Sequence, residues 1–199
     1  MRIPSIIPFT SLGLIAGLCL AACQSQQVVS PQQDFLANLK TLCGQAFEGR
    51  VISTEEVDAD WRKETLIMYV RDCDETGVKI PLHVGENRSR TWVIQWAETG
   101  KDLQLKHIHK HKDGTLDDVT WYGGDADAGT ATSTHVNFPV DEFSKTLFLE
   151  NDLDVSVVNV WRVSLTPGET FTYALSRPNR DFRAEFDLTR PVQIPPPSW

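Results

Sequence analysis

The segment with the clearest chemical pattern is residues 103–112, which reads LQLKHIHKHK and holds three of the five histidines. Side chains two residues apart on a β-strand point to the same face. His107, His109 and His111 should therefore share one face, which begins with two leucines. The opposite face should be solvent-facing; it holds Gln104, Lys106, Ile108, Lys110 and Lys112. We expect the histidine face to run from a packed interior toward the rim of a β-structure.

Two histidines at this spacing can direct both imidazoles at one metal ion, and a ligand from another strand then completes a site of zinc or copper type. Two other interpretations stay open: the histidines line a polar cavity wall or pack on aromatic rings with water at the rim, or they contact an organic ligand or haem. The candidate metal ligands are His107, His109, His111 and His135, with His83, Asp125 and Asp127 also available by residue type.

Two tryptophans form a second candidate site. Trp92 and Trp96 lie four residues apart in an alternating run, residues 91–96, and so share one strand face. Packing in a core is the ordinary role of such a face, and lining a ligand cavity is the alternative. We take both residues as candidate ligand contacts.

The sequence offers no recognisable set of catalytic residues. Ser133 and His135 lie two apart on a presumed strand, but no Gly-x-Ser-x-Gly motif accompanies them. A catalytic pair of carboxylates cannot be chosen from 27 acidic residues without geometry. We assign no catalytic residue and expect a protein that is not an enzyme.

The N-terminus has the pattern of an export signal. Arg2 precedes a mostly apolar stretch, residues 6–20, that is too short for a stable membrane span. The next residues, Leu20-Ala21-Ala22-Cys23, resemble the lipobox of bacterial lipoproteins. The resemblance implies that residues 1–22 are a cleaved signal and that acyl chains, palmitate among them, anchor the protein through Cys23. With Gln24 next, it also implies the periplasmic face of the outer membrane in a Gram-negative envelope.

The rest of the chain divides into a tether, one domain and a tail. Residues 23–33 are polar and Gln-rich and should act as a flexible spacer. Residues 34–190 are enough for a single β-rich domain with its own core, and residues 191–199 form a Pro-rich tail. The net charge of −8 disfavours nucleic acid and a broad contact with anionic lipids. Attachment to a membrane must therefore come from the lipid.

Cysteine count suggests one disulfide. Cys19 would leave with the signal and Cys23 would be acylated, so Cys43 and Cys73 remain. Outside the cytoplasm two remaining cysteines most often form a bridge. Free thiols and a metal site are the alternatives.

The periodicity predicts a mainly β domain with two short helices. A helix is expected over about 34–43, with Asp34 as its N-cap, and another over 139–149. Between and after them, short alternating runs are separated by tight turns, as in an antiparallel meander. Closure of such a meander gives an up-and-down barrel, and the layout resembles calycins, the class of lipocalins and fatty-acid-binding proteins. A β-sandwich is the alternative.

These features favour a lipid-anchored envelope protein that binds a small apolar ligand or a metal. Zinc and copper are the metals that the histidine spacing suits. The alternative is a ligand-free lipoprotein that acts in envelope assembly with a protein partner, which the sequence does not specify.

Overall fold

The computed structural model describes residues 29–199, so the expected signal and Cys23 lie outside the described residues. The described chain forms ten strands, two α-helices and three short 3-10 helices. None of these helices is both long and apolar enough to cross a membrane. In chain order the elements are α1 (Pro31–Lys40), β1 (Ala46–Val51), η1 (Glu56–Asp58), η2 (Trp61–Lys63), β2 (Leu66–Tyr69), β3 (Gly77–Val84), β4 (Asn87–Trp96), β5 (Leu103–His109), β6 (Tyr122–Asp125), β7 (His135–Pro139), α2 (Glu142–Glu150), η3 (Asp154–Ser156), β8 (Val160–Thr166), β9 (Thr170–Arg177) and β10 (Arg180–Val192).

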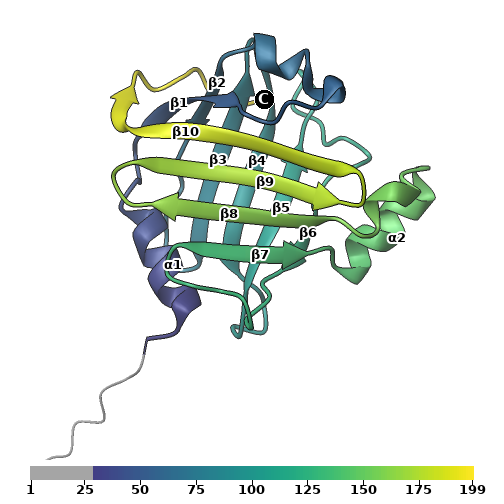
Figure 1. Ribbon diagram of the computed structural model, residues 1–199, viewed down its shortest axis with the longest axis horizontal. Helices are drawn as coiled ribbons and strands as arrows, with labels where there is room; N and C mark the ends of the chain where they lie inside the picture. The colour runs from purple at the N-terminus through teal and green to yellow at the C-terminus, as the bar shows by residue number, and fades with distance from the viewer. Residues whose placement is uncertain (1–28) are drawn as a thin grey trace, which may run out of the picture.

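The strands form one antiparallel sheet in the order β6-β5-β4-β3-β2-β1-β10-β9-β8-β7. Neighbours in this order follow one another along the chain, except that the last strand pairs with the first. In Figure 1 the strands β7 to β10 cross in front of β3 to β6, so the sheet curves back over itself. The predicted mainly β, up-and-down barrel with two short helices is confirmed, and the barrel is nearly closed.

The remaining seam lies between β6 and β7. One isolated bridge, Gly124 with Val140, joins its two sides, and the Asp141 amide donates to the Gly123 carbonyl at 3.1 Å. A Cβ atom on Gly124 would collide with the Pro139 carbonyl oxygen. Gly124, which belongs to β6, therefore lets two backbones approach at the seam.

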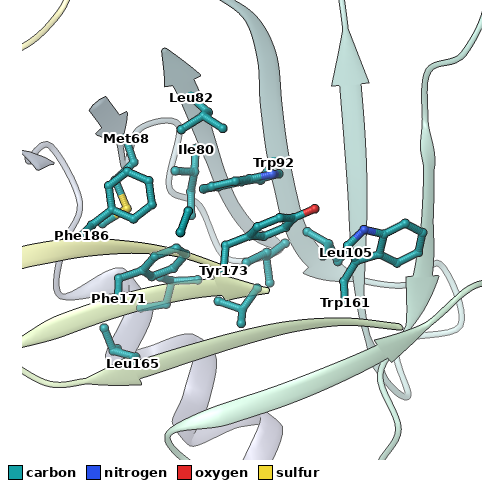
Figure 2. Packing of buried hydrophobic residues seen from close by; sticks show 14 of the residues in the cluster. Met68, Ile80, Leu82, Trp92, Leu105, Trp161, Leu165, Phe171, Tyr173 and Phe186 are labelled. Atoms are coloured by element: carbon teal, nitrogen blue, oxygen red, sulfur yellow. The ribbon is translucent and has the colours of Figure 1, made fainter. Parts of the chain in front are cut away.

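The core fills the barrel interior through period-two alternation. In β5 the side chains of Leu103, Leu105 and His107 are buried, whereas the residues between them are partly exposed. The alternating runs expected from the sequence fall in β1, β2, β4, β9 and β10. Figure 2 shows large apolar side chains from both halves of the sheet meeting in the interior.

Helix α1 packs against one end of the barrel. It begins at Pro31, three residues earlier than expected, because Ser30 and Gln33 form a capping box that makes Asp34 an interior residue. Phe35 and Leu39 are fully buried. The buried Gln32 side chain accepts a hydrogen bond from the Leu103 amide at 2.5 Å, which ties the helix to the start of β5.

Helix α2 follows β7 and flanks the seam. It begins at Glu142 instead of residue 139, because Pro139 still pairs within β7. Asp141 is the N-cap and accepts from the Ser144 amide. The same carboxylate forms an ion pair with Lys106 at 2.5 Å, with both side chains 12% exposed. Lys106 was expected on a solvent-facing side. That expectation was wrong, since α2 covers this part of β5.

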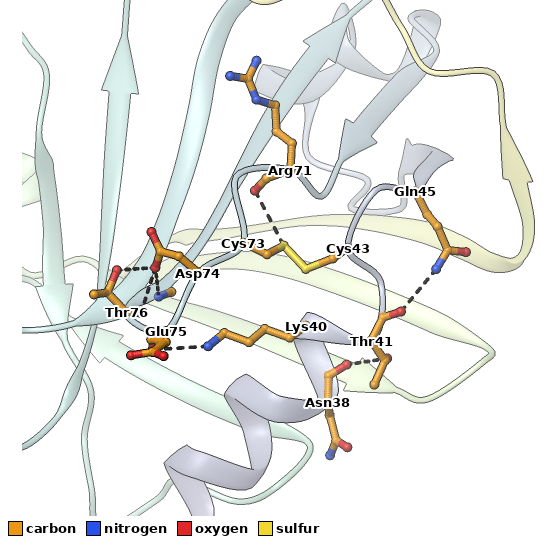
Figure 3. Close-up of a disulfide and its surroundings, with 11 residues drawn as sticks. Asn38, Lys40, Thr41, Cys43, Gln45, Arg71, Cys73, Asp74, Glu75 and Thr76 are labelled. Carbon is orange, nitrogen blue, oxygen red and sulfur yellow. Dashed lines mark hydrogen bonds between the residues drawn. A yellow bond between two sulfur atoms is a disulfide. The ribbon is translucent and has the colours of Figure 1, made fainter.

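A disulfide joins Cys43, just after α1, to Cys73, in the connection between β2 and β3 (Figure 3). The Cα atoms are 6.3 Å apart and the bridge closes a loop of 30 residues. Next to it, Lys40 donates to the Glu75 carbonyl at 3.3 Å. The predicted pairing is confirmed, and its place in the fold is to hold the end of α1 against the barrel.

The C-terminal segment contacts the opposite end of the barrel. Strand β10 extends to Val192, so the first residues of the expected tail belong to the sheet. The Trp199 amide donates to the Arg88 carbonyl at 3.3 Å, and the Arg88 guanidinium donates to the Pro197 carbonyl at 3.1 Å. The chain thus ends beside the turn between β3 and β4.

Loss of the bridge should destabilise the fold. Replacing both Cys43 and Cys73 with serine should lower the free energy of unfolding by about 3–4 kcal/mol, the chain-entropy value for a loop of this length. Urea unfolding of the variant measures the change, and the wild type under reducing conditions is the matched control. Equal unfolding midpoints for oxidised wild type and variant would contradict this prediction.

Candidate ligand cavity at the open end of the barrel

A cavity of about 360 Å³ opens at the end of the barrel opposite α1. It lies among the ends of β3, β5 and β9 and the beginnings of β4, β6 and β10. The connection between β1 and β2 forms its outer side. Its lining residues are Val57, Asp58, Trp61, Leu82, Arg90, Trp92, His107, His109, Tyr122, Tyr173, Leu175, Arg180, Phe182 and Ala184.

Aromatic rings form much of the wall and floor. Trp92 and Tyr173 stack with ring centroids 4.4 Å apart and an interplanar angle of 16°, and Figure 2 shows these rings lying parallel. Trp92 is only 4% exposed. Alternation brings Trp92 inward from β4, and antiparallel pairing sets it opposite His107 on β5. Together these rings give the cavity a rigid, mostly apolar floor.

His107 is buried in a hydrogen-bonded network. Its Nδ1 lies 3.1 Å from the Tyr122 carbonyl oxygen and its Nε2 lies 2.8 Å from the Tyr173 hydroxyl. A carbonyl only accepts, so Nδ1 donates its proton and Nε2 accepts from the hydroxyl. Burial lowers the pKa of His107 to about 3. The ring is therefore neutral at physiological pH, with both nitrogens engaged.

His109 lies nearer the mouth of the cavity. Its Nε2 is 3.2 Å from the Tyr122 hydroxyl. Burial, and secondarily the Arg90 charge, lower the pKa of His109 to about 4. Burial raises the pKa of Tyr122 to about 12. At neutral pH the pair consists of an uncharged imidazole and a protonated phenol, which can donate or accept hydrogen bonds without adding charge.

The mouth is bordered by residues 52–65, which we call the mouth segment; it contains η1 and η2, at the top of Figure 1. Arg180, the first residue of β10, donates to both carboxylate oxygens of Asp58 at 2.5 and 2.9 Å and also contacts Glu55. Trp61 packs edge-on against Phe182, with ring centroids 5.5 Å apart. An ion pair and an aromatic contact therefore hold the mouth segment onto the barrel.

The structure brings together only part of the predicted histidine set. His107 and His109 both face the cavity, whereas His111 lies beyond the end of β5 and is exposed. His135 lies at the start of β7, near the α1 end, and its Nδ1 contacts the Thr132 hydroxyl at 3.0 Å. Within residues 29–199 no three His, Cys, Asp or Glu side chains gather as a possible metal site. Zinc or copper binding stays a prediction.

Of the other candidate site residues, only one lines the cavity. Trp92 lines the cavity, but Trp96, at the far end of β4, packs against the core and is absent from the cavity lining. His83 is 5% exposed and lies away from the cavity; its Nε2 is buried without a partner within the described residues. Asp125 accepts from the Gln104 side chain, and Asp127 accepts from the Gly129 amide, so both stabilise local structure.

Sequence reasoning missed Arg90, Tyr122 and the pair Asp58–Arg180. Arg90 carried a usable signal, since it lies two residues before Trp92 and so belongs to the same strand face. Asp58 and Arg180 are 122 residues apart, and no spacing rule connects them.

Comparisons of the chain with protein-family models, with curated proteins and with solved structures found no match. The cavity's own geometry therefore supplies the argument about function.

The buried histidines should make stability fall in mild acid. Unfolded histidine has a pKa near 6.5, whereas His107 stays neutral in the folded state until about pH 3. Between these values the unfolded chain binds the extra proton, so stability is full above pH 6.5 and decreases by up to about 1.4 kcal/mol per pH unit as the pH falls.

His107→Gln should lose this contribution. The slope of unfolding free energy against pH, measured between pH 6.5 and 5, should be smaller than in the wild type. The difference should approach about 1.4 kcal/mol per pH unit, the contribution of one proton. His111→Gln, which alters an exposed histidine outside the cavity, is the matched control and should keep the wild-type slope. Identical slopes for wild type and His107→Gln would show that His107 is already protonated in the folded protein.

Proposed function

We propose that this protein is a lipid-anchored envelope protein whose barrel binds a small apolar or amphipathic molecule. The observation that carries the proposal is the cavity of about 360 Å³ at the open end of the barrel. Its volume falls in the usual range for small-molecule sites, and its mostly apolar lining with a few convergent polar groups is typical of them. The layout also resembles calycins, and this resemblance implies small-ligand binding.

The buried polar groups support a binding role. His107, Tyr173 and Tyr122 satisfy one another around the floor, so an apolar body can enter without breaking their hydrogen bonds. The cavity lining holds neutral imidazoles and protonated phenols and contains no Ser, Thr, Cys or Lys. Burial raises the pKa of Tyr122 to about 12, which disfavours the phenolate that a tyrosine nucleophile needs. We therefore propose binding, and not catalysis, as the role of this site.

The direction of the cavity fits a tethered protein. The described chain enters the domain at α1, at the end of the barrel opposite the cavity mouth (Figure 1). If Cys23 is anchored in the outer membrane, the short tether holds the α1 end nearest the lipid. The mouth then faces the periplasmic solution, so we propose that the ligand arrives from solution or from another envelope component.

Binding of a neutral apolar probe tests the function. N-phenyl-1-naphthylamine, which fluoresces in apolar surroundings, should bind the purified protein at one site. Leu175→Trp should weaken its affinity at least about ten-fold, because Leu175 lines the cavity and the larger ring fills part of it. Fluorescence titration measures the effect.

The control for this test is Leu116→Trp, which adds the same ring at an exposed position absent from the cavity lining. This variant should bind the probe as the wild type does. Absence of probe binding by the wild type, together with a purified mass that carries no bound molecule, would favour the ligand-free assembly role instead.

The anchor has a separate test. Cys23→Ser removes the thiol that accepts the lipid, so the variant should remain unacylated and leave the membrane fraction. Metabolic labelling with palmitate and fractionation of cells measure both effects, and Cys19→Ser is the matched control. Processing and fractionation of Cys23→Ser like the wild type would refute the anchor and leave the cavity proposal intact.

A further inference from the structure

The cavity contains one cation that forms no ion pair with any residue in the described part of the chain. Arg90 lines the cavity, and its guanidinium lies 4.9 Å from the centroid of the Trp61 ring. Its hydrogen bond to the Ser89 hydroxyl, at 3.2 Å, is to a neutral group. Among the described residues no carboxylate forms an ion pair with Arg90. Burial lowers the pKa of Arg90 from its ordinary value, yet a guanidinium stays charged in proteins.

Arg180, in the same lining, shows the contrasting arrangement. Its guanidinium is paired with Asp58 and Glu55. Asp58 is 3% exposed, and its oxygens are occupied by Arg180 and by the Ser53 hydroxyl, which donates at 2.8 Å. Since Asp58 is the only acidic residue in the lining, no carboxylate there is left for Arg90. Asp117, outside the lining, raises the pKa of His109 and of Tyr122 through its charge but forms no ion pair with Arg90. Among the lining residues the charge of Arg90 is therefore unpaired.

Neutral hydrogen-bonding groups lie next to this charge. Arg90 on β4 is directly opposite His109 on β5, and His109 contacts the Tyr122 hydroxyl. Both groups are uncharged at neutral pH, so neither repels the guanidinium or neutralises it. The planar fork of Arg90, with an imidazole and a phenol beside it, is suited to the two oxygens of a carboxylate.

We propose that Arg90 receives the acidic group of the ligand, so that the cavity selects small organic carboxylates with an apolar body. The inference rests on the proposed function and deepens it by naming the ligand class. The apolar body lies against Trp92, Tyr173 and Phe182, and the carboxylate lies at the mouth against Arg90. A positive charge that is partly buried and has no partner is costly, and the ligand's negative charge compensates it. A protonated, positively charged amine of the same shape is repelled by Arg90.

A matched pair of probes separates the charge from the shape. 1-Naphthaleneacetate and 1-naphthaleneacetamide have the same ring and differ in the acidic group. Calorimetric titration of the purified protein at pH 7 should give an affinity for the carboxylate about ten- to hundred-fold higher than for the amide, which is the range expected of charge-assisted hydrogen bonds. Added salt should weaken binding of the carboxylate and leave that of the amide unchanged.

Variants of Arg90 assign the preference to this residue. Arg90→Gln should abolish the preference by weakening the carboxylate to the affinity of the amide. Arg90→Lys should retain part of it, because the charge remains without the fork. Arg190→Gln, at an exposed arginine outside the cavity lining, is the control and should keep the full preference.

The outcomes distinguish this inference from the proposed function. Equal affinities of the wild type for acid and amide, or a preference that survives in folded Arg90→Gln, would overturn the role of Arg90 while small-molecule binding stands. No binding of either naphthalene probe or of N-phenyl-1-naphthylamine would overturn both. Thermal melting of each variant verifies that it is folded, and Arg90→Lys supplies the test if Arg90→Gln is not.

Discussion

The pairing of the last strand with the first is the contact on which the structure depends. Strand β10 is 13 residues long and pairs with both β9 and β1, so it joins the two halves of the meander. Without this pairing β1 and β10 would be exposed edges, and edges of this kind promote association between chains. Closing the sheet also forces the inward faces of β4, β5, β9 and β10 to meet, which creates the core and the cavity together.

The two ends of the barrel are formed by different interactions. At one end, α1 buries Phe35 and Leu39, and the disulfide between Cys43 and Cys73 holds its C-terminal end. At the other end, no helix of residues 29–199 enters the interior, and the mouth segment is held by the ion pair between Arg180 and Asp58. Apolar side chains of α1 fill the first end of the barrel. At the second end, the ion pair holds the mouth segment at the rim and leaves space for a molecule. This asymmetry is the physical basis of the proposed binding function.

Within the cavity, the polar groups pair with one another except for the charge of Arg90. His107 and Tyr173 satisfy each other, and Arg180 is neutralised by acidic partners. Arg90 has no such partner among the described residues. A protein that needed only stability would gain from an apolar residue at this position, because even partial burial of an unpaired charge is costly. The cavity therefore has a chemical polarity, with an apolar floor and a cationic mouth.

The sequence by itself determined the local elements and the class of fold. Period-two alternation in segments such as 91–96 and 103–109 predicts strands, because this signal comes from neighbouring residues. The disulfide follows from the cysteine count by elimination. The sequence does not determine the helix boundaries. Ser30 competes with Asp34 as a cap, and Pro139 suits a first helical turn but pairs within a strand.

Only the tertiary structure decided which side chains share the cavity. Residue spacing predicts the face that contains His107 and His109. His111 does not lie on this face, because β5 ends at His109. The distance of His135 from the others followed from the path of the sheet. Tyr122, Tyr173 and Arg180 come from three different strands, and they meet Arg90 only because closure brings these strands to one end of the barrel. Strand spacing fixes a face, whereas the partners across that face depend on how the whole sheet curves.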